Sequence, residues 1–256
     1  YLGRPDPDEL GEKMNALVRR PHGIILVTGP TGSGKTTTLY AALSQINSPD
    51  KKILTIEDPV EYQLRGINQM QVNTKIGVTF ASALRAFLRQ DPDVILVGEI
   101  RDKETVEIAV QASLTGHLVF STVHTNDAPS TFTRLTDMGV EPFLIASSVI
   151  AVQAQRLVRL LCKTCKQPMQ ASPLQLRQLG VTDSPSAQVF APKGCPDCSN
   201  LGYSGRRGIF ELVAVTDHVR DLVMAKSNSS DIRRAALKEG MRTLRMDGAQ
   251  KVLLGE

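Results

Sequence analysis

The sequence predicts an α/β fold in which a mostly parallel sheet is flanked by helices. Short runs of apolar and β-branched residues alternate along the chain with segments whose apolar residues recur at helical spacing. Two of these runs end directly in carboxylates, which is typical of buried parallel strands at the ligand-binding edge of a sheet. The 256 residues are enough for one large domain, or for one domain with an appendage.

The composition limits the classes of protein to which the chain can belong. Hydrophobic residues make up 41% and charged residues 22% of the chain, as in ordinary globular proteins. No apolar run approaches the roughly 18–20 residues that span a bilayer, and no signal peptide is recognisable. The net charge of +4 is too mild to indicate a nucleic-acid partner, and the absence of Trp argues against a base-stacking surface.

Residues 1–22 are expected to form a lead-in that contains one linker helix. Asp6 is the expected N-cap of this helix, with Pro7 at its first position, and Pro21 ends it. Because the chain begins at Tyr1 and not at a methionine, we expect it to be a fragment of a longer protein.

A strand predicted at residues 24–28 leads into a glycine-rich loop, and a segment with helical spacing follows the loop. The loop fits the pattern G-x-x-x-x-G-K-[ST], whose glycines let the backbone wrap round phosphate oxygens at the start of a helix. Lys35 can reach the β- and γ-phosphates, and the Thr36 hydroxyl can ligate Mg²⁺. The sequence therefore predicts a nucleoside triphosphate site made of Gly29, Pro30, Thr31, Gly32, Ser33, Gly34, Lys35, Thr36 and Thr37.

Two further strands end in acids. The strand predicted at residues 52–56 is followed by Glu57, Asp58 and Glu61, and for Glu61 a solvated acidic turn is an equally good interpretation. The apolar run at residues 94–97 ends in Gly98-Glu99. This is the Walker B arrangement, in which a buried strand delivers a carboxylate to Mg²⁺ and its waters, with Glu99 in place of the usual Asp.

Hydrolysis of a nucleoside triphosphate requires one acid near Mg²⁺ and one acid that orients the attacking water. Glu99 follows the buried run that places its backbone where the metal must lie, so we assign it to Mg²⁺. Glu57 ends the strand after the loop helix, nearer the γ-phosphate side, so we assign it as the general base. The reverse assignment stays open.

The strand predicted at residues 117–124 is bracketed by two histidines. His124 ends this strand and is expected to face the same crevice as Glu99, where an imidazole can hydrogen-bond a γ-phosphate. His117 begins the strand and is the weaker functional candidate. Asp102 is the expected N-cap of the preceding helix, which Gly116 ends.

Four cysteines form two close pairs separated by 29 residues: Cys162-x₂-Cys165 and Cys195-x₂-Cys198. Each pair can grip a tetrahedral metal from a tight knuckle, and four thiolates close the coordination shell, so the sequence predicts a structural Zn²⁺ site. Two disulfides, a redox pair and plain buried thiols are the alternatives.

The remaining segments are predicted with less specific signals. An edge strand is expected at residues 67–72, helices at residues 80–88, 127–138 and 143–150, and either a helix or a strand at residues 151–161. Residues 202–208 are expected to form a turn, residues 209–215 a strand, and residues 217–255 two or three short helices. The basic residues of this last segment are expected to form a solvated helical face: Arg233, Arg234, Lys238, Arg242 and Arg245.

The motifs in this order resemble one family, the secretion-superfamily ATPases of bacterial type II secretion and type IV pilus systems. The resemblance covers nearly the whole chain. It rests on the phosphate loop and on four further stretches: Thr55-Ile56-Glu57-Asp58-Pro59-Val60-Glu61, Gly98-Glu99-Ile100-Arg101-Asp102, Thr115-Gly116-His117 with His124-Thr125-Asn126, and the glycine-rich stretch from Gly202 to Leu212. The tetracysteine segment resembles that of the assembly-type or secretion members, since the retraction-type pilus motors lack it.

The resemblance implies a RecA-like P-loop NTPase core with a Cys₄ zinc-binding appendage and a helical C-terminus. We divide the chain into a lead-in at 1–22, the ATPase core at 23–161, a tetracysteine subdomain at 162–200 and a C-terminal subdomain at 201–256. Family members form homo-hexamers at the cytoplasmic face of the inner membrane, where they meet platform and docking proteins. They also carry an N-terminal domain that supplies arginines to the nucleotide site, and this chain lacks it.

The expected activity is Mg²⁺-dependent ATP hydrolysis that drives assembly of pilin-like subunits, with ATP, Mg²⁺ and Zn²⁺ as ligands. The expected location is cytoplasmic, with peripheral membrane association through partners. Two other functions were weighed: a nucleic-acid-translocating ring ATPase, which low aromatic content and weak net charge disfavour, and a nucleotide-gated adaptor with little turnover. The sequence does not distinguish a secretion system from a pilus system.

Overall fold

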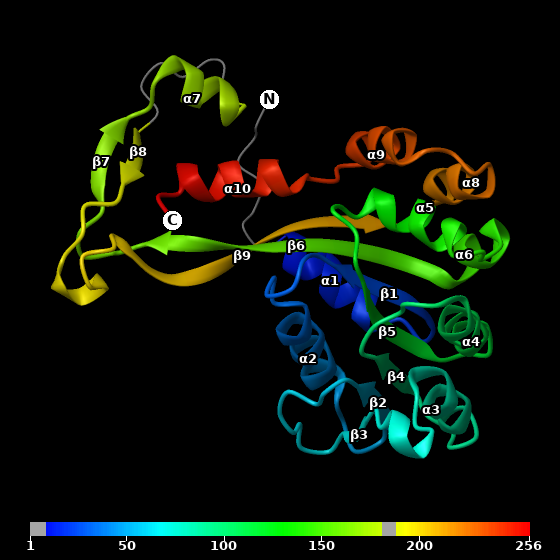
Figure 1. Cartoon of the computed structure of the whole chain (residues 1–256). Coiled ribbons are helices and arrows are strands. Elements are labelled where there is room, and N and C mark those ends of the chain that lie inside the picture. Colours follow the sequence, from blue (N-terminus) through cyan, green and yellow to red (C-terminus); the bar gives the residue numbers. More distant parts are fainter. Residues whose placement is uncertain (1–8, 181–187) are drawn as a thin grey trace.

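A computed structural model describes residues 9–180 and 188–256, so the predicted cap at Asp6 and Pro7 lies outside the described residues. It contains a seven-stranded sheet in the order β3-β2-β4-β5-β1-β6-β9, in which every neighbouring pair is parallel except β6 and β9 (Figure 1). The predicted mostly parallel sheet is therefore confirmed. Its strands are β1 (Gly23–Thr28), β2 (Ile53–Glu57), β3 (Asn68–Gln71), β4 (Val94–Val97), β5 (Leu118–Val123), β6 (Val149–Leu161) and β9 (Tyr203–Ala214).

Helices cover both faces of the sheet because its central strands are apolar on both sides. In β1, Ile25 and Val27 pack in one apolar cluster with α1 (Glu9–Val18) and α2 (Lys35–Ile46). Ile24 and Leu26, which alternate with them, pack in a second cluster on the other face. Helices that contribute to this second cluster are α3 (Phe80–Phe87), α4 (Lys103–Leu114), α5 (Pro129–Asp137), α6 (Pro142–Ser148), α8 (Asp217–Met224) and α9 (Ser229–Lys238).

Strands β6 and β9 form a long antiparallel ribbon that extends beyond the rest of the sheet (Figure 1). The undecided segment 151–161 lies in β6, and the helix predicted at residues 143–150 ends at Ser148, where β6 takes over. The turn predicted at residues 202–208 is wrong, because β9 begins at Tyr203 and pairs with β6. Cross-strand partners explain the strand: the Arg159 guanidinium lies 4.0 Å from the Tyr203 ring centroid, a cation–π distance.

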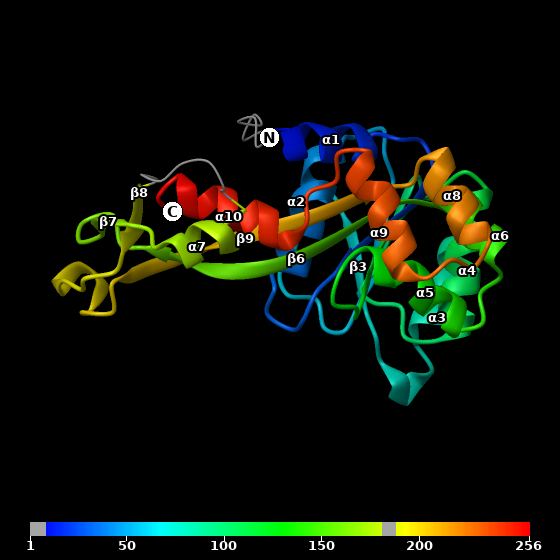
Figure 2. The ribbon, with the colours of Figure 1, turned by 90° about the horizontal axis from the view of Figure 1, so that it is seen from above.

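The outer end of the ribbon carries the cysteines and a small second sheet of β7 (Gln167–Gln170) and β8 (Gln188–Ala191), with α7 (Pro173–Gln178) beside it (Figure 1). Helix α10 (Leu244–Leu253) lies along the ribbon (Figure 2), and the Asp247 carboxylate accepts a hydrogen bond from the Phe210 amide at 2.8 Å. These contacts attach the C-terminal helix to the same strands that leave the parallel sheet.

The C-terminal basic residues are less solvated than the sequence predicts. Arg233 pairs with Asp127 at 2.6 Å, and Arg242 is only 20% exposed and lies 3.6 Å from Glu9. These two arginines therefore connect α9 and the segment before α10 to the start of α5 and to α1. Only contacts between elements distant in sequence distinguish them from solvated arginines.

Candidate active site and metal centre

The glycine-rich loop connects the carboxyl end of β1 to α2. A side chain at Gly29 is excluded because its Cβ would lie 2.5 Å from the Gln155 carbonyl oxygen. Gly34 immediately precedes α2 with a φ of 86°, which favours glycine, and it provides no side-chain cap for the helix. The first N–H groups of α2 are therefore available to an anion.

Lys35 and Ser33 present polar groups in this loop. The Lys35 ammonium group donates to the carbonyl oxygens of Gly29 at 2.9 Å and Pro30 at 3.1 Å, so it lies over the loop. Burial lowers the pKa of Lys35, the nearby Glu99 carboxylate opposes this shift, and Arg156 adds to it. The Ser33 hydroxyl is buried and, among the described residues, has no hydrogen-bond partner. A loop with an ammonium group, free N–H groups and an unpartnered hydroxyl fits bound phosphate groups.

Glu99 follows β4 and lies beside His124, which follows β5. Its carboxylate is 12% exposed, with one oxygen 2.6 Å from the Arg101 guanidinium and the other 3.4 Å from His124 Nε2. A hydroxyl at the end of β1 fixes the segment after His124, because the Thr125 amide donates to Thr28 Oγ1 at 2.8 Å. Strand ends β1, β4 and β5 therefore bring Glu99 and His124 to the same edge of the sheet as Lys35.

Glu57 ends β2 and is 4% exposed. One carboxylate oxygen accepts a very short hydrogen bond from the Tyr40 hydroxyl of α2. The other accepts from Thr55 Oγ1 at 2.5 Å and from Gln69 Nε2 at 3.2 Å. A carboxylate offers about four lone-pair positions, so three donors leave roughly one for a further partner.

One cavity of about 580 Å³ collects the predicted nucleotide-site residues. It is lined by both carboxylates and by most of the loop: Thr31, Gly32, Gly34, Lys35, Thr36, Thr37, Glu57, Asp58, Glu61, Glu99 and His124. His117 is not among them. It lies at the amino end of β5, where its Nδ1 is 2.8 Å from the Ala112 carbonyl oxygen.

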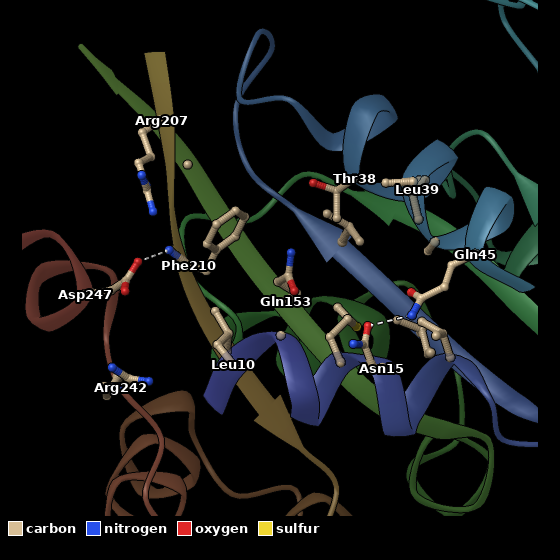
Figure 3. Close-up of a pocket in the computed structure, with 18 of the residues that line it drawn as sticks. Leu10, Asn15, Thr38, Leu39, Gln45, Gln153, Arg207, Phe210, Arg242 and Asp247 are labelled. Atoms are coloured by element: carbon tan, nitrogen blue, oxygen red, sulfur yellow. Dashed lines mark hydrogen bonds between the residues drawn. The ribbon is translucent and has the colours of Figure 1, made fainter. Parts of the chain in front are cut away.

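A second cavity of about 410 Å³ lies between α1, α2, β9 and α10 (Figure 3). Leu10, Leu39 and Phe210 contribute apolar walls, with the buried Gln153 amide at its base. The described lining of this cavity includes no residue of the glycine-rich loop and neither predicted carboxylate. The phosphate-binding chemistry is therefore confined to the first cavity.

Three residues near the loop escaped the sequence analysis: Tyr40, Gln155 and Arg156. The Gln155 amide donates to the Ser33 carbonyl oxygen at 2.8 Å and accepts from Thr38 Oγ1 at 2.9 Å. Arg156 donates to the carbonyl oxygen of Asn126 at 2.8 Å. Polar side chains inside an apolar run such as residues 149–161 are the only sequence signal for this role, because burying them without partners would be costly.

The four cysteines converge at the outer end of the ribbon, although they come from two distant segments. Their sulfur atoms all lie within 4.8 Å of one another, and neighbouring pairs are 3.7–3.9 Å apart. These distances exclude disulfides, whose sulfur atoms lie about 2.05 Å apart. Four ligands at about 2.3 Å from a tetrahedral Zn²⁺ would be separated by about 3.8 Å.

Backbone amides favour a thiolate in this cluster. Although burial opposes ionisation, hydrogen bonds from the backbone of Cys195 and Gly202 lower the pKa of the Cys198 thiol to about 6. Cys165 Sγ likewise accepts from the Gly194 amide at 3.3 Å. Because metal ligands must be deprotonated, this donor set fits Zn²⁺.

Comparison with known proteins identifies the relatives of the chain. The sequence model of the family described as "Type II/IV secretion system protein" matches residues 6–256. The chain belongs to this family. The family membership confirms the resemblance drawn from the motifs, and its solved members share the P-loop ATPase fold.

Two curated relatives show how much of each protein is shared. Type II secretion system protein E of Aeromonas hydrophila is 56% identical over 243 residues, which are 95% of this chain and 48% of the relative. The type IV pilus assembly ATPase PilB of Thermus thermophilus is 49% identical over 98% of this chain and 29% of the relative. This member of the family therefore spans about half or less of the length of these relatives.

Solved structures support the fold. The pilus retraction motor PilT with bound ADP superposes with a TM-score of 0.63 at 32% identity, over 97% of this chain and 65% of PilT. The ATPase DotB of Legionella pneumophila has a TM-score of 0.69 at 23% identity, over 98% of this chain and 62% of DotB, a likeness that concerns the fold alone. No helix in the described part of the chain has both the length and the apolar character that a membrane span requires.

Proposed function

We propose that the chain is the nucleotide-hydrolysing part of an ATP-driven motor for a type II secretion pseudopilus or a type IV pilus. The observation that carries the proposal is the single cavity that joins the phosphate loop, two strand-end carboxylates and His124. Relatives with 49–56% identity are named as type II secretion protein E and as a pilus assembly ATPase.

Within this proposal, the loop and Lys35 hold the phosphates, because N–H groups and an ammonium group converge on one edge of the sheet. Thr36 and Glu99 would hold Mg²⁺, which neutralises charge on the β- and γ-phosphates when bound. Two observations support Glu99 in this role: its carboxylate lines the cavity, and it interacts electrostatically with Lys35. His124 would hydrogen-bond the γ-phosphate from the neighbouring strand end.

Glu57 remains the proposed general base, oriented by Tyr40 and Thr55 with about one lone-pair position left for water. The specific observation in favour of the reverse assignment is its burial, since at 4% exposure it meets water less readily than Glu99 does. The two assignments predict different Mg²⁺ dependences for the Gln variants at these positions.

The cysteine cluster is proposed to hold one structural Zn²⁺ through Cys162, Cys165, Cys195 and Cys198. Sulfur spacing near that of a tetrahedron and amide donors to the sulfurs support this ligand set. A closed Cys₄ shell leaves no open position for chemistry, so the metal would stabilise the outer end of the ribbon.

The sequence-based boundaries at 1–22, 23–161, 162–200 and 201–256 stay a proposal, as do the homo-hexamer, the membrane-platform and docking partners, and the peripheral position at the inner membrane. The names of the relatives support a place in a secretion or pilus machine. Because this chain spans only part of those relatives, each of these statements concerns the whole protein.

A complementation experiment tests the motor function. Cells that lack the full-length gene receive either the wild-type protein or the Lys35→Ala variant, and pilus fibres and secreted proteins are measured. We expect the wild type to restore one of these two outputs and Lys35→Ala to restore neither. Normal output with Lys35→Ala would refute an ATP-driven role.

A further inference from the structure

Tyr40 lies in α2, one helical turn after Thr36, and is only 1% exposed. Its hydroxyl donates to a Glu57 carboxylate oxygen, and its ring meets the Tyr62 ring edge-to-face with centroids 4.7 Å apart. The side chain therefore connects the helix that starts at the phosphate loop with the strand end that carries a proposed catalytic acid.

The hydrogen-bond donors that the structure gives Glu57 are all uncharged: the Tyr40 and Thr55 hydroxyls and the Gln69 amide. A buried carboxylate without a paired cation depends on such donors to stay ionised and oriented. Burial, and then the hydrogen bond to Glu57, raise the pKa of Tyr40 well above its ordinary range. The phenol therefore remains a donor throughout the pH range in which an enzyme works.

The same contacts reach the loop after β2. The Gln69 amide donates to the Tyr40 hydroxyl at 3.3 Å and to the Tyr62 carbonyl oxygen at 3.1 Å, while its own oxygen accepts from the Leu64 amide at 2.6 Å. This loop also brings Asp58 and Glu61 to the cavity. A displacement of α2 is thus transmitted to Glu57 and to the loop through side chains that are hydrogen-bonded to one another.

We propose that Tyr40 is a positioning residue for ATP hydrolysis, whose hydroxyl fixes the Glu57 carboxylate at the cavity wall and couples it to the phosphate-loop helix. This inference rests on the proposed ATPase function. Because α2 begins with Lys35 and Thr36, the hydroxyl links the position of the phosphate-binding residues to the orientation of Glu57. The orientation of Glu57 matters whether it acts on water or on the metal.

The test is steady-state ATP turnover by the full-length protein with Tyr40→Phe, which keeps the ring and removes the donor. We expect kcat to fall by about tenfold or more, while KM for ATP changes less than about twofold, because the phosphate contacts of Lys35 and the loop are retained. In a Glu57→Gln background, Tyr40→Phe should lower kcat by less than about twofold, because the two changes remove the same interaction. Tyr203→Phe, on the distant ribbon, is the matched control and should leave turnover unchanged.

A second variant covers the case in which Tyr40→Phe does not fold. Thr55→Val removes the other short donor to Glu57 with little change in volume, and it should show the same loss of kcat and the same non-additivity with Glu57→Gln. Wild-type kcat in both variants overturns the inference, as does an equal loss in the wild-type and Glu57→Gln backgrounds. A wild-type protein that does not hydrolyse ATP overturns the proposed function instead, so the two failures are distinguishable.

Discussion

Gln155 gives a prediction whose size follows from its contacts. The side chain is 2% exposed and makes three hydrogen bonds: to the Ser33 carbonyl oxygen at 2.8 Å, from Thr38 Oγ1 at 2.9 Å and from Gln153 Nε2 at 3.2 Å. Methionine has a similar length and offers none of these partners. Leaving a buried polar group unpaired costs about 1–3 kcal/mol, and the part-buried Thr38 hydroxyl can rotate toward water, so Gln155→Met should cost about 2–4 kcal/mol.

Thermal unfolding of the 256-residue chain, followed by circular dichroism at fixed pH and salt, measures this cost. A loss of this size should lower the melting temperature by about 5–10 °C. Because the Ser33 carbonyl belongs to the phosphate loop, ATP affinity in the folded variant should also fall by about tenfold, which corresponds to about 1.4 kcal/mol. Gln170→Met, at an exposed position of β7, is the control. A Gln155→Met protein with both the melting temperature and the ATP affinity of the wild type would refute the reasoning.

The remaining predictions concern the metal, the acids and a buried carboxylate. Changing any of the four clustered cysteines to serine should abolish binding of one Zn²⁺ per chain by elemental analysis, and wild-type protein that reproducibly lacks zinc would contradict the site. Glu57→Gln should retain Mg²⁺-dependent ATP affinity and lose turnover, whereas Glu99→Gln should lose both; the opposite pattern reverses the two roles. Burial raises the pKa of Glu211, which accepts a hydrogen bond from the Ala128 amide, so the native state binds this proton more tightly than the unfolded state. The wild type therefore gains stability as pH falls through the raised pKa, and Glu211→Gln should lower the melting temperature more at pH 5 than at pH 8; an equal effect at both pH values would contradict this.

Local patterns were sufficient to predict the sheet, most helices and the phosphate loop. The Asp102 side chain caps α4 by accepting from the Thr105 amide at 2.8 Å, as its position before an apolar helical stripe indicates. Glu99 and His124 reach one cavity because the carboxyl ends of parallel strands share an edge. These predictions depend on short-range sequence and on one general property of α/β sheets.

Contacts between distant segments were beyond such patterns. The start of β9 at Tyr203 depends on pairing with β6, so its glycines predicted a turn. Tyr40 looks like an ordinary core residue of an amphipathic helix, and only its meeting with Glu57 gives it a polar partner. Register and side-chain partners across the fold are therefore the information that the sequence alone did not supply.

The measurement that tests the central claim most directly is Mg²⁺-dependent phosphate release from ATP by the purified full-length protein and its Lys35→Ala variant. The account predicts turnover by the wild type that stops when Mg²⁺ is chelated. It also predicts that Lys35→Ala hydrolyses no ATP and binds it far more weakly, because Lys35 is the cation of the phosphate loop. Lys35→Ala protein that hydrolyses ATP at the wild-type rate would contradict the account.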